Sequence, residues 1–320
     1  ISYSENYQEN KSWQMTESWV GSVSVPYGYW TWSYNLSQSE YLTSQTLPNS
    51  DILYSFGNST NHTLGANRIV HRGKKRKIAL DAVLTLRDSE SFTRIRDLET
   101  RSEVGSRKLS IAKAGIKWTE YFPSGMLFVN PSCSQGLRGF GALDDRNSEF
   151  SPKAQFTLCG IYGYATARIP LFGAKLPLSW TATWDSQFSA NPLFGTEQFS
   201  VGGLGSVRGF KDTWVSGDSG FFMQNDFKFN AHNIMSNLGA REFSAPSSLK
   251  AIDVTFFHDV GISYPQDDKT HWVLSGAGVK LSYASKYADI NLTYAQGLHA
   301  PSSLGEESGV VYFNMDVKFP

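Results

Sequence analysis

Residues 30–39 read WTWSYNLSQS, and their side chains alternate strictly between two kinds. One face of the extended chain would carry Trp30, Trp32, Tyr34 and Leu36, and the other would carry threonine, serine and asparagine. A period of two is that of a β-strand with one apolar and one polar face. Aromatic and aliphatic side chains on the apolar face are typical of a barrel strand that faces lipid.

The same alternation returns in residues 78–87, 288–294 and 311–319. Short turn-like sequences and long polar connections largely take turns between such segments, as antiparallel up-and-down order requires. Short turns of this kind belong on the periplasmic side of an outer-membrane barrel and long loops on the outside. About thirteen strands are legible, at residues 13–25, 29–44, 51–70, 76–92, 107–122, 125–135, 153–168, 177–190, 219–230, 249–262, 272–283, 287–296 and 310–319.

The composition also favours a membrane barrel over a soluble enzyme. Only 18% of the 320 residues are charged, whereas 14% are aromatic. The 29 basic and 29 acidic residues give no net charge, which argues against broad electrostatic binding of nucleic acid. No apolar run reaches the roughly 18 residues of a transmembrane helix, so the chain would cross a membrane only as a closed barrel. A soluble β-sandwich is the alternative, but it would not need so many tryptophans and tyrosines near strand ends.

Signatures of enzymes and metal sites are missing from the sequence. The six histidines show no HExxH spacing, no nucleophile elbow is present, and the two cysteines form no CxxC pair. We therefore expect no enzymatic activity, no cofactor and no metal. Cys133 and Cys159 lie on segments predicted to be neighbouring strands, where they would form either a cross-strand bridge or two isolated thiols.

Residues 197–220, EQFSVGGLGSVRGFKDTWVSGDSG, interrupt the alternation with a polar, glycine-rich loop. Gly202, Gly203 and Gly205 would permit the positive backbone torsions of a tight tip and let it pack close to a wall. We expect residues 191–218 to form a long loop that folds inward, with Arg208 as the group that anchors it.

The predicted strand 249–262 places its polar residues on the side of the lumen. Its outer positions, which suit lipid, are Ile252, Val254, Phe256 and Val260, and its inner positions are Asp253, Phe257, Asp259 and Gly261. His258 falls on the outer side, so it forms no dyad with its neighbour Asp259.

Four segments carry a resemblance to a known family. PYGYWTW at 26–32, GFGALDD at 139–145, the 197–220 loop and FHDVG at 257–261 occur in the order found in TpsB transporters. These are the outer-membrane partners of two-partner secretion, within the BamA-like superfamily. The resemblance implies a sixteen-stranded antiparallel barrel with periplasmic POTRA domains and a plug helix.

The resemblance also implies which residues hold the loop. In the family the loop arginine reaches the aspartate of an F-x-D-x-G strand motif, so we predict an ion pair between Arg208 and Asp259. The predicted loop anchor and lumen gate comprises Val207, Arg208, Gly209, Phe210, Phe257, Asp259 and Gly261. Gly261 would leave room for the loop, and the two phenylalanines would wedge its tip against the wall. The alternative is that Arg208 only solvates a loop in the lumen.

Strand counting by this resemblance makes 191–218 the sixth extracellular loop and 310–319 the sixteenth strand. Residues 13–320 would then be barrel, and residues 1–12 the remnant of an extracellular loop. The first three strands, the POTRA domains and the plug would lie outside this sequence.

The resemblance implies a pore in the Gram-negative outer membrane that secretes a large partner exoprotein. The client would be an adhesin, a haemolysin or a contact-dependent toxin, passing in unfolded form through a monomeric barrel set in outer-membrane lipid. The alternative is a BamA-like insertase, which should lack the YGYW turn and the GFGALDD loop at these places. A passive porin or a barrel enzyme would need constriction-loop charges or a catalytic constellation, and the sequence supplies neither.

Overall fold

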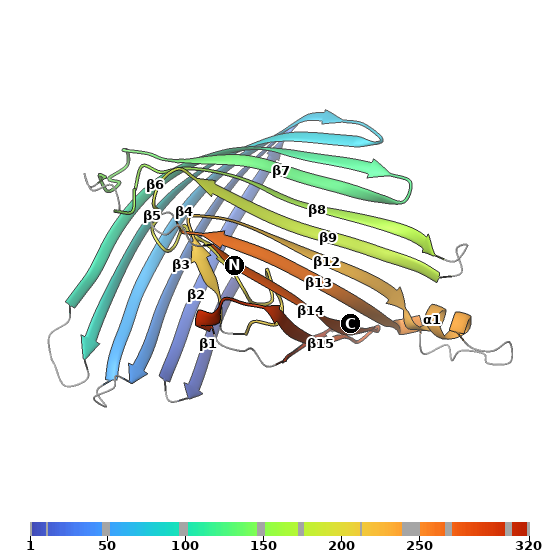
Figure 1. Ribbon diagram of the computed structural model, residues 1–320. Helices are drawn as coiled ribbons and strands as arrows, with labels where there is room; N and C mark the ends of the chain where they lie inside the picture. Colours follow the sequence, from blue (N-terminus) through green and yellow to red (C-terminus); the bar gives the residue numbers. More distant parts are fainter. Residues whose placement is uncertain are drawn as a thin grey trace. The chain divides into compact units, whose positions relative to one another are not determined.

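The computed structural model describes residues 2–10, 12–46, 52–95, 102–145, 151–171, 176–211, 213–238, 250–265, 271–304 and 309–318. Long antiparallel strands dominate it (Figure 1). Fourteen of them form one sheet whose hydrogen-bonded order follows the chain order, except that β10 and β11 leave it to form a small sheet of their own. The chain divides into two compact units. It passes between them after Arg72, within β5, β6 and β7, and finally after Thr157.

The first unit contains the N-terminal strands. They are β1 (Ser2–Asn10), β2 (Ser12–Tyr27), β3 (Trp30–Thr46) and β4 (Ile52–Arg72), with parts of β5 (Arg76–Ile95), β6 (Ser102–Phe122) and β7 (Gly125–Gly136). Their register keeps apolar residues together, because Trp32 lies opposite Val25 on one side and Ala66 on the other. The alternation seen in the sequence thus becomes a continuous apolar face.

The second unit contains most of the C-terminal half. Its strands are β8 (Thr157–Leu171), β9 (Leu176–Ser189), β12 (Ser219–Asn230), β13 (Ile252–Tyr264), β14 (Trp272–Ala284), β15 (Ala288–His299) and β16 (Val310–Val317). A short helix, α1 (Ala231–Leu238), follows β12, and a 3₁₀ turn, η2 (Ser302–Leu304), precedes β16. In the described part of the chain, no helix is long and apolar enough to cross a membrane.

The prediction that residues 1–12 form a loop is wrong for residues 2–10. They form β1, which pairs with β2 from Ser2 opposite Val20 to Asn10 opposite Ser12. The sequence SYSENYQEN lacks the apolar alternation that marked the other strands. Backbone amides and carbonyls nevertheless pair with a neighbouring strand whatever the side chains are, so a polar hairpin is compatible with the sheet.

Other strand positions agree with the prediction to within a few residues. Most strands extend beyond their predicted ends, β6 starting at Ser102 rather than 107, for example. The predicted ends at 51, 249 and 319 lie outside the described residues. Helix α1 was not predicted. Both cysteines, Cys133 and Cys159, are disulfide-bonded, so the bridged alternative is the one that forms.

The buried core of the second unit lies where the small sheet packs on the large one. The small sheet pairs β10 (Phe199–Val201) with β11 (Val215–Gly217). The core cluster consists of Phe199, Val201, Val207, Phe210, Val215 and Leu274. All but Leu274, which comes from β14, belong to the loop between β9 and β12, so burial of apolar surface holds this loop in place.

Candidate functional site

The loop between β9 and β12 is a β-hairpin rather than an irregular connection. Ser200 lies opposite Ser216 in its two strands, and their hydroxyl oxygens are 2.8 Å apart. Positive φ angles occur at Gly202 and Gly203, as predicted, but not at Gly205. The hairpin presents the segment 207–210 to the face formed by β12 to β15.

Arg208 and Asp259 meet in a buried, two-pronged ion pair. The guanidinium donates from Nε to Oδ2 of Asp259 at 2.6 Å and from Nη2 to Oδ1 at 2.6 Å. The backbone amide of Arg208 also donates to Oδ2, at 3.0 Å. Arg208 is 6% exposed and Asp259 is fully buried. The structure therefore brings together the two residues predicted to pair, in the geometry that makes arginine–carboxylate bonds strong.

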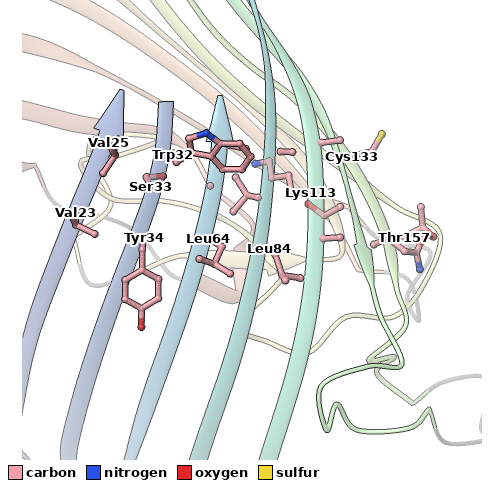
Figure 2. A pocket seen from close by; sticks show the side chains of 18 residues that line it. Val23, Val25, Trp32, Ser33, Tyr34, Leu64, Leu84, Lys113, Cys133 and Thr157 are labelled. Atoms are coloured by element: carbon pink, nitrogen blue, oxygen red, sulfur yellow. Dashed lines mark hydrogen bonds between the residues drawn. The ribbon is translucent and has the colours of Figure 1, made fainter. Parts of the chain in front are cut away.

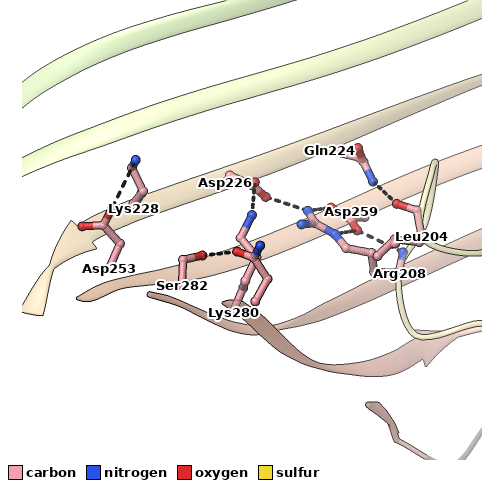
Figure 3. A network of polar contacts seen from close by, with 10 residues as sticks. Leu204, Arg208, Gln224, Asp226, Lys228, Asp253, Asp259, Lys280 and Ser282 are labelled. Carbon is pink, nitrogen blue, oxygen red and sulfur yellow. Dashed lines mark hydrogen bonds and ion pairs between the residues drawn. The ribbon is translucent and has the colours of Figure 1, made fainter. Parts of the chain in front are cut away.

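Two further side chains complete what we call the Arg208 seat. They are Asp226, which Figure 3 shows beside Arg208 and Asp259, and Phe257. Nη2 of Arg208 also donates to Oδ1 of Asp226 in β12, at 2.7 Å. The guanidinium carbon lies 3.7 Å from the ring centroid of Phe257, one face of which it therefore covers. Asp226 and Phe257 are directly opposite in the β12–β13 register, which explains why both reach the same arginine.

The charges of the seat are uneven, because one guanidinium faces two carboxylates. Lys280 of β14 lies 4.0 Å from Oδ2 of Asp226 and supplies a second, weaker cation. Burial disfavours the charged guanidinium, but the hydrogen bonds and charges of Asp259 and Asp226 outweigh it and raise the pKa of Arg208 above its ordinary value. Arg208 thus stays charged, and its attraction to the two carboxylates, which holds the loop in place, is kept.

Glycines make room for the loop backbone on the wall. Gly209 has a φ of 103°, and a Cβ there would lie 2.6 Å from the amide nitrogen of Gly297. A Cβ added at Gly276 of β14 would overlap the backbone carbonyl of Arg208. Loop and wall therefore touch backbone to backbone, which only glycine allows at these two positions.

The remaining predicted residues lie at the same contact. Gly261 leaves room for the side chains of Val201 and Val207, since its Cβ would lie 3.0 Å from Cγ2 of Val207. Val207 and Phe210 are fully buried in the core cluster. Phe257 lies under the guanidinium of Arg208, and Phe210 lies in the core cluster, so the two phenylalanines of the predicted wedge contact the loop region at these two places.

Sequence reasoning missed Asp226, Gly276 and Gly278. All three lie on the inner face. Gly276 is opposite Asp259, and Gly278 is opposite Phe257, whose ring leaves no room for a Cβ at Gly278 because Cζ would lie 2.6 Å from it. The glycines of SGAGVK at 275–280 were therefore an available signal for a strand that others approach closely. His258 and Phe256 are exposed on the other face of β13, as the alternation predicted.

Comparison with known proteins places this hairpin and its wall in a family. Residues 1–283 match the family described as haemolysin secretion/activation protein ShlB/FhaC/HecB. The chain belongs to this family. Among its relatives, the outer membrane transporter CdiB of Dickeya dadantii is 30% identical over 310 residues, which cover 95% of this chain and 51% of that protein. The hemolysin transporter protein ShlB of Serratia marcescens is 26% identical over 295 residues, 90% of this chain and 48% of that protein.

The fold of the ShlB/FhaC/HecB chain is similar to that of solved CdiB structures. CdiB from Escherichia coli superimposes with a TM-score of 0.76 at 25% identity, over 95% of this chain and 55% of that one. The predicted fold class, an all-β transmembrane barrel with a large antiparallel sheet, is confirmed, and the protein is located in the bacterial outer membrane. The chain spans about half the length of the curated relatives it matches.

Replacing Asp226 by asparagine should have a small effect in this ShlB/FhaC/HecB protein. The amide keeps the shape and can still accept from Nη2 of Arg208, and the Asp226 side chain is 26% exposed, so solvent screens its charge. If the protein exports a partner protein, we expect Asp226→Asn to lower the exported amount by less than about fivefold. Export is measured as partner protein in the medium relative to partner protein in the cells. A loss as large as that of Asp259→Ala would show that Asp226 contributes as much as Asp259 to holding Arg208.

Proposed function

We propose that this protein is an outer-membrane pore that secretes a large partner exoprotein. The observation that carries the proposal is the Arg208 seat, a buried charge network between an inward hairpin and the strand wall, in a chain of the ShlB/FhaC/HecB family. A client of the adhesin, haemolysin or contact-dependent toxin class fits a family whose relatives include a named hemolysin transporter.

In this proposal the 191–218 loop gates the lumen. Val207, Arg208, Gly209 and Phe210 anchor it, and Phe257, Asp259 and Gly261 form the wall on which it rests. Each charge-assisted hydrogen bond of this network contributes about 1.5 to 3 kcal/mol as long as water is excluded. Once the client enters and water reaches the seat, each exposed ion pair contributes only about 0 to 1 kcal/mol, so the loop can be displaced.

The client would pass in unfolded form, because an extended chain is narrow and can pair with an exposed strand edge on its way. Folding at the cell surface would then prevent its return. In this proposal the protein is a monomeric barrel in contact with outer-membrane lipid. It binds no nucleic acid and uses no cofactor. No catalytic step is part of the mechanism.

The test is deletion of the intact gene in the source bacterium, with restoration from a plasmid. We expect one large exoprotein to disappear from the medium and to return on complementation, while the total of outer-membrane barrels stays normal. A general fall in outer-membrane barrels would instead identify an insertase and contradict the proposal.

A further inference from the structure

The apolar face of the first unit carries a groove of about 840 Å³ (Figure 2). Its floor consists of small side chains from three adjacent strands: Ala66 of β4, Ala82 of β5, and Ala112 and Ala114 of β6. Larger apolar side chains rise beside this floor, among them Trp32, Leu64 and Leu84. Because alanine side chains are short, this strip leaves a trough between the larger residues, in which an apolar chain can lie.

The groove lies on a face that must be covered by something apolar. Trp32 is 54% exposed and Leu64 51% exposed, and both belong to the face that the alternation assigns to lipid. An exposed apolar surface of this extent is stable only against lipid or another protein.

A polar pocket of about 420 Å³ adjoins the groove on the same face. Its lining includes Asn58, Thr60, His62, Asp88, Glu90, Lys108, Ser110 and Phe140. The groove and the pocket are two residues apart along a strand, which is a step of about 7 Å. Leu64 and Ala112 line the groove, whereas His62 and Ser110 line the pocket. The hydroxyl of Tyr34, which lines the groove, is 2.8 Å from Nδ1 of His62, which lines the pocket. Groove and pocket therefore form one amphipathic depression.

The pocket offers both a cation and an acceptor. Lys108 Nζ is 2.9 Å from Oδ2 of Asp88, but more than half of the lysine side chain is exposed, so its ammonium is accessible to a ligand. The side chain of Asp88 is 47% exposed, so its carboxylate can also accept a hydrogen bond from a ligand.

Phe140 is held at the rim of the pocket in a costly conformation. Its φ is 57°, in the left-handed region that residues with a side chain rarely adopt, and the residue is 70% exposed. The loop is fixed there because Ser110 Oγ donates to the carbonyl of Gly139 at 2.8 Å, and the amide of Leu143 donates to that of Lys108 at 2.8 Å. Strain kept at an exposed aromatic residue indicates a role for that residue in binding.

We propose that the depression binds one glycolipid of the outer leaflet. An acyl chain lies on the alanine floor, a sugar hydroxyl donates to the carboxylate of Asp88, a phosphate meets Lys108, and Phe140 covers the head group. The pocket includes Phe140, which follows β7 in one of the long connections that belong outside the cell, so the head group is on the outer side. This site is independent of the Arg208 seat and of the client.

The test measures lipid retained by the purified full-length protein with native mass spectrometry. The protein is delipidated, loaded with lipid A or with phosphatidylethanolamine in detergent, and released from the micelle. Ala112→Phe fills the floor, and Lys108→Ala removes the cation. Val70→Phe is the matched control, because Val70 is exposed on the same face of β4 but lies outside the groove. Heat-modifiable migration on a gel verifies that each barrel is folded.

We expect the unaltered protein and Val70→Phe to retain lipid A, and Ala112→Phe and Lys108→Ala to lose at least about fivefold of it. Secretion should be unchanged in folded Ala112→Phe. Equal retention of lipid A by Ala112→Phe, or no retention by the unaltered protein, would overturn the site. Equal retention of phosphatidylethanolamine would overturn its assignment to a glycolipid and leave ordinary membrane lipid as the occupant.

Discussion

Asp259→Ala in the full-length protein should reduce the exported exoprotein at least about tenfold, because it leaves the Arg208 charge buried with only half of its partners. The substitution removes three of the hydrogen bonds that Arg208 makes, two from the guanidinium and one from the backbone amide. Breaking a buried ion pair from one side costs about 3 to 5 kcal/mol, and the loop would leave its seat rather than bear this cost. Client in the medium, normalised to client in the cells, is the measurement.

Asp253→Ala is the matched control for this variant. Asp253 lies on the same face of β13 and also has a basic partner, Lys228, at 3.4 Å. Its side chain is about a third exposed, so loss of its charge is screened and export should stay near normal. If Asp253→Ala lowered export as much as Asp259→Ala, the cause would be the loss of a negative charge from β13 in general and not the loss of the Arg208 seat.

Gly276→Val should displace the loop by sterics alone. The added side chain would occupy the place of the Arg208 carbonyl, and a backbone cannot move aside as the end of a flexible side chain can. The charges of the seat are untouched, yet the loop cannot reach them. In planar bilayers we expect the mean ionic current of the full-length protein to rise at least about threefold, since a displaced loop no longer narrows the lumen.

Gly21→Val is the control for that experiment. Gly21 also lies within a strand, but a Cβ there would meet only the ring of Trp19, at 3.8 Å, which is ordinary contact. Its current should equal that of the unaltered protein. An unchanged current in Gly276→Val, with the barrel correctly folded, would mean that the seated loop does not limit conductance.

Much of the architecture was predictable because apolar and polar side chains alternate along the strands with a period of two. Alternation located β3, β5, β13 and β15 and placed Asp259 and Phe257 on one face, with His258 on the other. The pairing of Arg208 with Asp259 could not be predicted in this way. The alternation shows which face of the strand a side chain lies on, but not which residue of a distant loop lies near it. The family resemblance supplied that step.

What remained hidden depended on contacts between distant segments. Strand β1 has a polar sequence, and only its backbone pairing with β2 makes it a strand. Asp226 enters the seat because the β12–β13 register sets it opposite Phe257, and no local pattern fixes a register between strands. The sequence does not show why position 276 is a glycine. The reason is the backbone carbonyl of Arg208, which lies where a Cβ of residue 276 would be.

A double-mutant cycle on secretion tests the central claim most directly. Arg208→Ala, Asp259→Ala and the double variant are compared with the unaltered full-length protein, at equal amounts of folded barrel. If the pair anchors the loop for secretion, the double variant should lose clearly less than the sum of the two single losses, in logarithmic units, because each single change already breaks the same bond. Strictly additive losses would contradict the account, since they would mean that the two residues act on secretion independently.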